Sequence, residues 1–470
     1  MTPHAEKSLV THRGGGEPEQ ATMTGRRLKD SDLTQLLRRA REAAQRGAMH
    51  PGAQLWLLCG GARAALGAQL SRPLYSAPTL PPACFRTAEE TGRWEHTTQR
   101  SMIEAYTDNA TLYRELHPGT SIEDAAERAL VCSTVWNRRE QRRKSAACNT
   151  ERSFREHWRT SESEALSPNA WCASFVRAFH GRTLTFLGDS ISRQQYAQLC
   201  CSCRDFLVLH PRRKAHWHCH SGPCLNGMEG FYLVELQDAA SGSRCTVQYL
   251  YHTGRAPRHV RTVLPLAIAE AGDRVVKSNV IALGLGAWIA SGTQHNEREW
   301  KATLEAATTV LGTVGFRGVL LWMEYFAGHF GSPTGEWGKL AKNATRCQPV
   351  SRASASANVG TLAGNRWAQA LPAPIWHTAR VSLDRHMDHP GSRAIERDLD
   401  NPGWGAHPFA AMFDCRHFCA PPSSHSTATC ALASSDPNIV VAPFATGFPG
   451  ATLEARNKML LPLLRTCVRP

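Results

Sequence analysis

Short apolar runs alternate with amphipathic stretches through the second half of the chain. The runs end in glycine, proline or polar residues, and they lie at residues 182–188, 279–286, 317–326 and 438–444. Their length and composition predict buried strands, and the intervening stretch at 297–311 has the spacing of a helix. Buried strands that alternate with helices indicate an α/β fold with a mainly parallel sheet. In such folds ligands bind beyond the carboxyl ends of the strands.

The first part of the chain lacks this alternation. Residues 1–30 are polar and glycine-rich, which predicts disorder, whereas residues 31–46 place leucines on one helical face. Residues 71–120 are proline-rich and irregular in pattern. We therefore expect a variable N-terminal region over residues 31–125, followed by the main domain over residues 126–470.

Two local signals bear on this N-terminal region. Ser121, with Asp124 three residues later, has the spacing of a capping box and predicts the start of a helix. The most apolar window, residues 53–70, is interrupted by Arg63, and its unbroken part is too short to cross a membrane. Membrane anchoring is therefore not evident from the sequence.

Charge and cysteine content narrow the class of protein. The 470 residues carry a formal net charge of +14, which favours acidic partners such as nucleic acid, anionic membranes or an anionic polysaccharide. The dense basic run at residues 138–144 is more typical of a solvated face, so we expect no specific nucleic-acid binding. The 16 cysteines are scattered without regular zinc knuckles, which favours disulfides in an oxidising compartment. Glycosylation sequons at Asn109 and Asn343 agree with that location.

A Gly-Asp-Ser sequence stands at the exit of the apolar run that ends at residue 188. Ser190 can be read as the N-cap of the helix that follows, or as a nucleophile. A nucleophilic serine needs a base to remove its proton, an orienting group for that base, and donors for the oxyanion. The backbone N–H of Ser190 at a helix start would supply one such donor. The residue types alone leave both readings open.

The best partners for Ser190 lie in the sequence FDCRHFC, residues 413–419. Asp414 and His417 are three residues apart and are flanked by cysteines, so one helical turn or a braced loop would bring them to one side. A rival is the sequence DRHMDH, residues 384–389, which contains His386. That segment is polar throughout and predicts a solvated loop.

A metal site is the competing interpretation of another segment. The sequence HWHCHSGPC contains zinc-ligand types, namely His216, His218, Cys219, His220 and Cys224. The spacing is not that of a standard knuckle, and no second cluster completes it. In a cysteine-rich chain we expect disulfides here and no metal.

Taken together, these motifs resemble the plant trichome-birefringence-like proteins, which form the PC-esterase branch of the SGNH (GDSL-type) hydrolases. The sequence GRTLTFLGDSISRQQYAQLCC resembles that family's GDSLSRNQ block, and NVIALGLGAWIA resembles its second core strand. The sequences WMEYFAGHFGSPTGEW, GAHPF and DCRHFCAPP are similar to its SPSHF, His-Pro and DCSHWCLPG blocks. The blocks occur in the family's order over about residues 130–470.

The resemblance implies a three-layer α/β/α sandwich and O-acetyl transfer to cell-wall polysaccharides in the Golgi lumen. It makes Ser190 the nucleophile, His417 the general base and Asp414 the group that orients the base. The support and substrate positions that it implies are Gly188, Asp189, Arg193, Gly284, Gly286, Trp288, His329 and Trp337. It implies no bound cofactor; an acetyl donor such as acetyl-CoA, or an acetylated intermediate, would be a co-substrate. The acceptor would be a carbohydrate, and the positive charge would suit an acidic glycan.

The chain also departs from the family pattern. Gly284 replaces an asparagine that is expected to donate to the oxyanion, and the loss of one such donor typically costs about 100- to 1,000-fold in rate. Gln194 and Phe418 replace an asparagine and a tryptophan. The resemblance also implies an oxyanion glycine in the loop after the GDS helix, and the sequence does not fix it among Gly222, Gly227 and Gly230. The sequence therefore leaves three functions open: an acyltransferase, an esterase with the same triad, and a glycan-binding protein with weakened catalysis.

Overall fold

The computed structural model describes part of the chain. It covers residues 75, 78–85, 93–96, 110–133, 156–159, 168–208, 231–252, 257–285, 297–330, 347–350, 362–369, 371, 373–383, 385–386, 389, 415 and 451–468. The chain divides into compact units at residues 1–72 and 73–470, and every described residue belongs to the second. The predictions for residues 1–30, 31–46, 53–70 and 438–444 lie outside the described residues.

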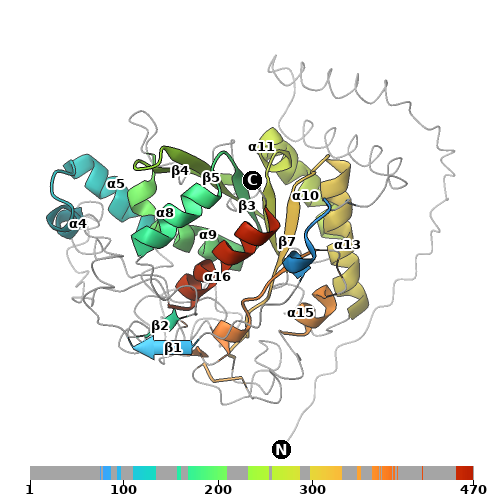
Figure 1. Cartoon of the computed structure of the whole chain (residues 1–470). Helices are drawn as coiled ribbons and strands as arrows, with labels where there is room; N and C mark the ends of the chain where they lie inside the picture. The colour runs from blue at the N-terminus through green and yellow to red at the C-terminus, as the bar shows by residue number, and fades with distance from the viewer. Residues whose placement is uncertain are drawn as a thin grey trace, which may run out of the picture. The chain divides into compact units, whose positions relative to one another are not determined.

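A six-stranded mixed sheet forms the centre of the second unit (Figure 1). The strands follow the order β4-β5-β3-β6-β7-β8, and the antiparallel pairing within the sheet joins β4 to β5. Their bounds are β3 Thr183–Gly188, β4 Phe231–Asp238, β5 Ser243–Tyr251, β6 Val280–Gly284, β7 Val319–Met323 and β8 Ile375–Trp376. The other neighbouring pairs are parallel, so the predicted α/β class with a mainly parallel sheet is confirmed.

The central strands β3, β6 and β7 are the ones that the apolar runs predict. Every residue of β6 and β7 is buried, because helices cover both faces of the sheet. Strands buried on both faces carry continuous apolar runs, which is why the sequence identifies them. The β4–β5 hairpin and the two-residue strand β8 were not predicted. In β4, buried and partly exposed positions alternate, so its apolar signal is weaker.

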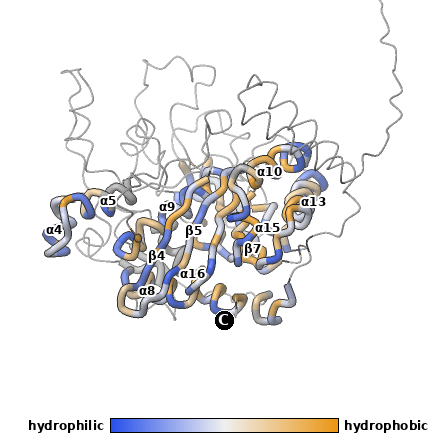
Figure 2. The backbone as a smooth tube through the Cα atoms, turned by 90° about the horizontal axis from the view of Figure 1, so that it is seen from above, coloured by the Kyte–Doolittle hydropathy of each residue, from blue (hydrophilic) through white to orange (hydrophobic). Residues whose placement is uncertain are grey.

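Helices pack against both faces of the sheet. The helices have the bounds α4 Ala110–Leu116, α5 Ile122–Ser133, α8 Pro168–Ala178, α9 Ser190–Ser202, α10 Pro257–Ala271, α11 Asp273–Val276, α13 Glu297–Thr313, α15 Ala363–Ala368 and α16 Ala451–Cys467. One core lies between the sheet and α8, α9 and α16, and the other between the sheet and α10, α13 and α15 (Figure 1). Along α10 and α13, hydrophilic and hydrophobic residues alternate (Figure 2), as in helices that bury one face.

Shorter elements complete the described structure. They are the 3₁₀ helices η1 Pro82–Phe85, η2 Arg204–Phe206 and η6 Arg380–Ser382, and the antiparallel pair β1 Arg93–His96 and β2 Glu156–Arg159. Helix α5 begins as predicted, with the backbone N–H of Asp124 donating to the Ser121 hydroxyl at 3.0 Å. Helix α4 lies within the proline-rich stretch at residues 71–120, whose sequence pattern did not predict it. Among the described helices, none combines the length and the apolar character needed to cross a membrane.

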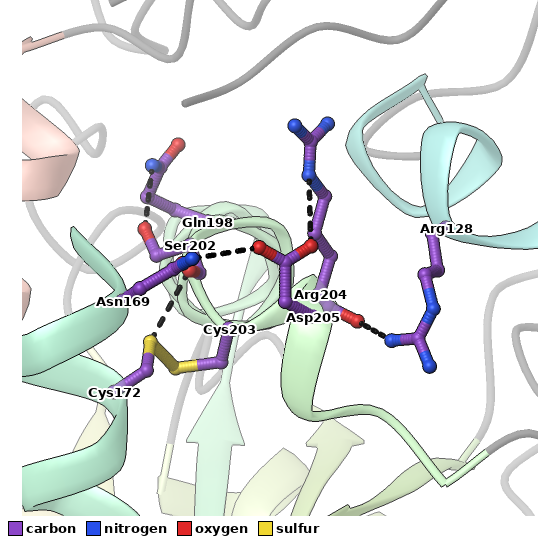
Figure 3. Close-up of a disulfide and its surroundings, with 8 residues drawn as sticks. All are labelled: Arg128, Asn169, Cys172, Gln198, Ser202, Cys203, Arg204 and Asp205. Atoms are coloured by element: carbon purple, nitrogen blue, oxygen red, sulfur yellow. Dashed lines mark hydrogen bonds and ion pairs between the residues drawn. A yellow bond between two sulfur atoms is a disulfide. The ribbon is translucent and has the colours of Figure 1, made fainter. Parts of the chain in front are cut away.

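A disulfide anchors the C-terminal end of α9 to α8. It joins Cys172 on α8 to Cys203, the residue that follows α9 (Figure 3). Near it, the Gln198 side chain donates to the Ser202 hydroxyl at 3.2 Å. This end of α9 is thus held covalently, while its other end begins at Ser190.

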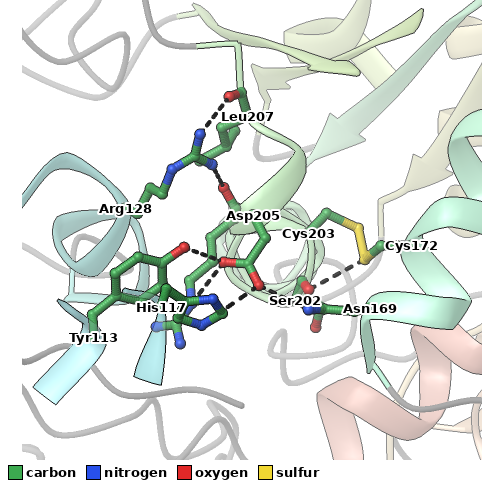
Figure 4. Close-up of polar contacts among 10 residues, drawn as sticks. Tyr113, His117, Arg128, Asn169, Cys172, Ser202, Cys203, Asp205 and Leu207 are labelled. Atoms are coloured by element: carbon green, nitrogen blue, oxygen red, sulfur yellow. Dashed lines mark hydrogen bonds and ion pairs between the residues drawn. A yellow bond between two sulfur atoms is a disulfide. The ribbon is translucent and has the colours of Figure 1, made fainter. Parts of the chain in front are cut away.

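Asp205 links the N-terminal helices to the same end of α9 (Figure 4). Its carboxylate accepts hydrogen bonds from the Tyr113 hydroxyl at 2.6 Å and from the Asn169 amide at 2.9 Å. The His117 and Arg204 side chains lie 4.0 and 3.7 Å from its oxygens. Because these partners come from α4, α8 and η2, the cluster fastens α4 to α8 and to the 3₁₀ turn that follows α9.

Candidate active site

The carboxyl ends of five adjacent parallel strands, β5, β3, β6, β7 and β8, meet at one edge of the sheet. Gly188 at the end of β3 lies opposite Gly284 at the end of β6, and Met323 of β7 lies opposite Trp376 of β8. The residues that follow these ends therefore gather along this edge, where open α/β sheets bind ligands. Ser190 belongs to this set.

Asp189, and not Ser190, caps helix α9. Its backbone is extended, and its carboxylate accepts a hydrogen bond from the Ile191 backbone N–H at 2.9 Å. Asp189 is fully buried, whereas Ser190 is partly exposed as the first residue of the helix. The interpretation of Ser190 as the N-cap is therefore wrong, because the neighbouring aspartate has that role.

Two glycines let the strand ends and the start of α9 approach closely. A Cβ atom on Gly188 would clash with the Gly284 carbonyl and the Ser192 hydroxyl. A Cβ atom on Gly284 would clash with Met323 and with the same hydroxyl. The Gly284 carbonyl oxygen accepts hydrogen bonds from the Ser192 hydroxyl at 3.2 Å and from the Asp189 backbone N–H at 3.4 Å. The glycine at position 284 therefore allows this close packing, and an asparagine fits there only if the Met323 methyl group and the Ser192 hydroxyl move.

Tyr249 holds the two peptide groups before Ser190. Its hydroxyl lies 3.2 Å from the Gly188 carbonyl oxygen and 3.1 Å from that of Asp189, and it donates to both. Burial raises the pKa of Tyr249 well above its ordinary value, although the charge of Arg193 opposes part of that shift. The hydroxyl thus stays protonated and remains a donor. The Arg193 backbone N–H also donates to the Asp189 carbonyl, at 3.1 Å.

A buried histidine that the sequence did not single out lies beside this turn. His252 follows β5, and its backbone N–H donates to the Gly188 carbonyl at 2.8 Å. Burial, with a smaller contribution from His259, lowers the pKa of its imidazole from 6.5 to about 3. The rings of the two histidines lie 5.1 Å apart between centroids. His252 is therefore neutral at physiological pH.

Glu324 and His377 form a carboxylate–imidazole pair that sequence reasoning also missed. They directly follow the adjacent strands β7 and β8, and the His377 Nδ1 lies 3.0 Å from a carboxylate oxygen of Glu324. The other carboxylate oxygen accepts the backbone N–H groups of Thr378 at 2.8 Å and Ala379 at 3.0 Å. Burial acts to raise the pKa of Glu324, but the hydrogen bonds and the His377 charge outweigh it and hold the pKa below its ordinary value. The available signal was Glu324, a charged residue within the apolar run 317–326, whereas His377 follows a strand of two residues that leaves no pattern.

His329 does not lie where a substrate would reach it. The side chain is fully buried, with one ring nitrogen 3.1 Å from the Gln348 carbonyl oxygen and the other 2.8 Å from that of Ser382. We therefore correct the expected substrate contact to an internal bracing role. The solvated loop expected over residues 384–389 is also wrong where the structure describes it, since Arg385 and His389 are buried.

The segment that contains the expected base is described at Cys415 alone. Cys415 is buried and forms a disulfide with Cys347, and its carbonyl oxygen accepts the His329 backbone N–H at 2.9 Å. Cys415, which directly follows Asp414 in the sequence, is therefore bonded to two residues of the segment that follows β7. The remaining positions lie outside the described residues: Gly222, Gly227, Gly230, Gly286, Trp288, Trp337, Asp414 and His417.

Neither a group of metal ligands nor a known relative identifies the site. Within the described part of the chain, no group of three or more histidine, cysteine or acidic side chains is placed to hold a metal ion. The zinc-ligand types at residues 216–224 lie outside it. No family model matches the chain, and no curated protein matches it significantly. The family resemblance therefore rests on the sequence motifs.

Proposed function

We propose that the protein is a serine-dependent O-acyltransferase that transfers an acyl group, in the first instance acetyl, to a carbohydrate hydroxyl. The observation that carries this proposal is the position of Ser190. It is the first residue of a helix at the carboxyl end of a central parallel strand, and Asp189 has the capping role. An SGNH-type three-layer sandwich is the finer fold that we propose for the described α/β unit.

The chemistry would proceed in two transfers. In the first, the Ser190 oxygen attacks the carbonyl carbon of the acyl donor, and His417, oriented by Asp414, takes the serine proton. The oxyanion accepts a hydrogen bond from the Ser190 backbone N–H at the start of α9. The donor's leaving group departs with that proton, and the acyl group remains on Ser190 as an ester.

In the second transfer, a sugar hydroxyl takes the place of the leaving group. His417 removes the proton of that hydroxyl, and the sugar oxygen attacks the acyl carbon. The Ser190 oxygen then leaves and recovers its proton from His417. No resident cofactor is needed, because the acyl donor, such as acetyl-CoA or an acetylated intermediate, is a co-substrate. If water takes the place of the sugar, the same steps make the protein an esterase.

We also propose that the protein works in the secretory pathway, in the Golgi lumen. The disulfides Cys172–Cys203 and Cys347–Cys415 support an oxidising compartment. The positive net charge supports an acidic glycan as the acceptor.

The decisive experiment follows a labelled acetyl group. The protein is incubated with labelled acetyl donor, with and without oligosaccharide acceptors, and the label is measured on Ser190, on sugar and as free acetate. Label on sugar that needs the acceptor supports transfer, whereas acetate release without acceptor indicates hydrolysis. Ser190→Ala should abolish both, and Ser192→Ala is the matched control because its hydroxyl bonds the Gly284 carbonyl instead. If turnover does not depend on Ser190 with any donor, the proposed function is wrong.

A further inference from the structure

His377 presents an imidazole with a fixed orientation at the carboxyl edge of the sheet. A carboxylate only accepts hydrogen bonds, so the contact between His377 Nδ1 and Glu324 places the proton on Nδ1. The other ring nitrogen, Nε2, is not used by this contact: it accepts a hydrogen bond when the imidazole is neutral and donates one when the imidazole is protonated. The His377 side chain is 29% exposed and that of Glu324 14%, so the ring is the more open partner. Within the described part of the chain, the structure gives the ring no hydrogen bond besides that to Glu324.

The Glu324 carboxylate has backbone partners besides the imidazole of His377. Glu324 already accepts the backbone N–H groups of Thr378 and Ala379, and its own carbonyl accepts the Thr378 hydroxyl at 2.9 Å. Together with the Glu324 backbone N–H, which donates to the Trp376 carbonyl at 3.1 Å, these bonds fasten the exit of β8 to the exit of β7. What the His377 contact adds is a fixed tautomer and ring direction, as in sites where a carboxylate orients a functional histidine.

The distance between His377 and Ser190 determines whether the imidazole can take part in proton transfer. Three strand-to-strand steps separate β3, which ends before Ser190, from β8, which ends before His377. Neighbouring strands lie about 4.8 Å apart, so the two strand exits are roughly 14 Å apart. Proton transfer needs heavy atoms within about 3 Å. His377 is therefore placed to bind a ligand that extends along the edge, and not to deprotonate Ser190.

We propose that His377, held by Glu324, forms an acceptor subsite that binds a hydroxyl of the saccharide chain several sugars away from the acylated position. This inference rests on the proposed acyl transfer to carbohydrate and specifies the acceptor as an oligosaccharide or polysaccharide. Nε2 forms a hydrogen bond with a sugar hydroxyl, which can donate to the neutral ring or accept from the protonated one. A monosaccharide at Ser190 cannot reach the subsite, whereas a chain of several sugars does.

Two variants separate the binding role from the structural one. In His377→Asn the side-chain amide retains a donor near Nδ1 for Glu324, but the polar group at the position of Nε2 is lost. His377→Gln extends its amide toward the position of Nε2 and should restore part of the binding. His180→Asn is the matched control, because His180 is exposed and lies before β3, at the opposite edge of the sheet. The asparagine oxygen can accept the Arg244 backbone N–H that His180 Nδ1 accepts at 3.1 Å. Thermal unfolding of each variant shows whether the fold is retained.

The measurement is a binding titration with xylan and homogalacturonan oligosaccharides of increasing length, performed on Ser190→Ala protein. The titration needs no turnover, so it remains valid if the proposed acyl transfer fails. We expect His377→Asn to weaken binding of the longer chains by about tenfold, the size of one hydrogen bond, and to leave the monosaccharide unaffected. In active protein the KM for long acceptors should rise while kcat and the acetylation of Ser190 stay constant.

Three outcomes would overturn this proposal. Unchanged affinity at every length would mean that no sugar contacts His377. An equal loss for monosaccharide and oligosaccharide would place the ring at the reacting hydroxyl. Slower acetylation of Ser190 without acceptor would make His377 part of the acylation chemistry.

Discussion

The carboxylate of Asp189 accepts the backbone N–H of Ile191 at 2.9 Å, across the residue that we propose as the nucleophile. Asp189 is fully buried and its backbone is extended, as in an N-cap. The following residue, Ser190, therefore begins the helix without having to cap it. Capping and nucleophilic attack, which compete for one side chain in the sequence, are divided between two residues in the structure.

This division predicts that a substitution at Asp189 lowers stability, whereas a substitution at Ser190 removes activity. Asp189→Ala should lower the free energy of unfolding by about 1 kcal/mol or more, because the cap of α9 is lost. Ser190→Ala should change it by less than about 0.5 kcal/mol while it abolishes acyl transfer. Urea denaturation measures the stability of both variants. If Ser190→Ala proves as destabilising as Asp189→Ala, the serine contributes to the cap after all.

The close approach at Gly284 gives a second prediction. Gly284→Ala and Gly284→Asn should each destabilise the protein by about 1–3 kcal/mol, since any Cβ there meets Met323 and the Ser192 hydroxyl. The asparagine should not increase activity, because its side chain must displace these neighbours. In a Ser192→Ala, Met323→Val background the cost of Gly284→Ala should fall. Denaturation midpoints of the four combinations test this, and strictly additive costs would rule out the proposed clash.

The sequence predicts the strands that are buried on both faces, because burial on both faces requires a continuous apolar run. Strands β3, β6 and β7 are buried on both faces and therefore appear as apolar runs. Strand β8 has two residues and leaves no periodic signal, and its pairing with β7 depends on contacts far apart in the chain.

The candidate site follows the same rule. Ser190 was identifiable because Gly-Asp-Ser directly follows a buried strand. The Glu324–His377 pair joins residues 53 positions apart, and the contact depends on the adjacency of β7 and β8, which the sequence does not state. His329 was assigned from a motif as a substrate contact, and its burial could not be known without the packing around it.

Buried His252 predicts a loss of stability in acid. Burial, and to a smaller extent His259, lowers its pKa from 6.5 to about 3. Between these values the unfolded chain binds a proton that the folded protein excludes, so the free energy of unfolding falls as the pH decreases from about 6.5 to about 3. One such group contributes up to about 1.4 kcal/mol per pH unit.

The measurement for His252 is urea denaturation at a series of pH values. Across this window, His252→Gln should show a smaller slope of stability against pH than the unaltered protein. Equal slopes in the unaltered protein and His252→Gln would mean that His252 is not protected from protonation.

Tyr249 gives the last prediction, because its hydroxyl donates to the carbonyl groups of Gly188 and Asp189. In a trans peptide the C=O and N–H groups point in opposite directions, so a bond that holds the Asp189 carbonyl also orients the Ser190 N–H. If that N–H stabilises the oxyanion, Tyr249→Phe should lower kcat by about tenfold or more and leave KM unchanged. The stability cost should be about 1 kcal/mol, since both carbonyls retain a backbone donor, the N–H of His252 for Gly188 and that of Arg193 for Asp189.

Tyr232→Phe is the control for Tyr249→Phe, because it removes a hydroxyl from the neighbouring ring on β4. Steady-state kinetics with a fixed acceptor, together with the rate at which labelled acetyl reaches Ser190, measures both variants. Tyr249→Phe should slow the labelling of Ser190 as much as it slows turnover, whereas Tyr232→Phe should leave both rates unchanged. A Tyr249→Phe variant that loses stability but labels Ser190 at the normal rate would show that the hydroxyl braces the turn without orienting the oxyanion donor.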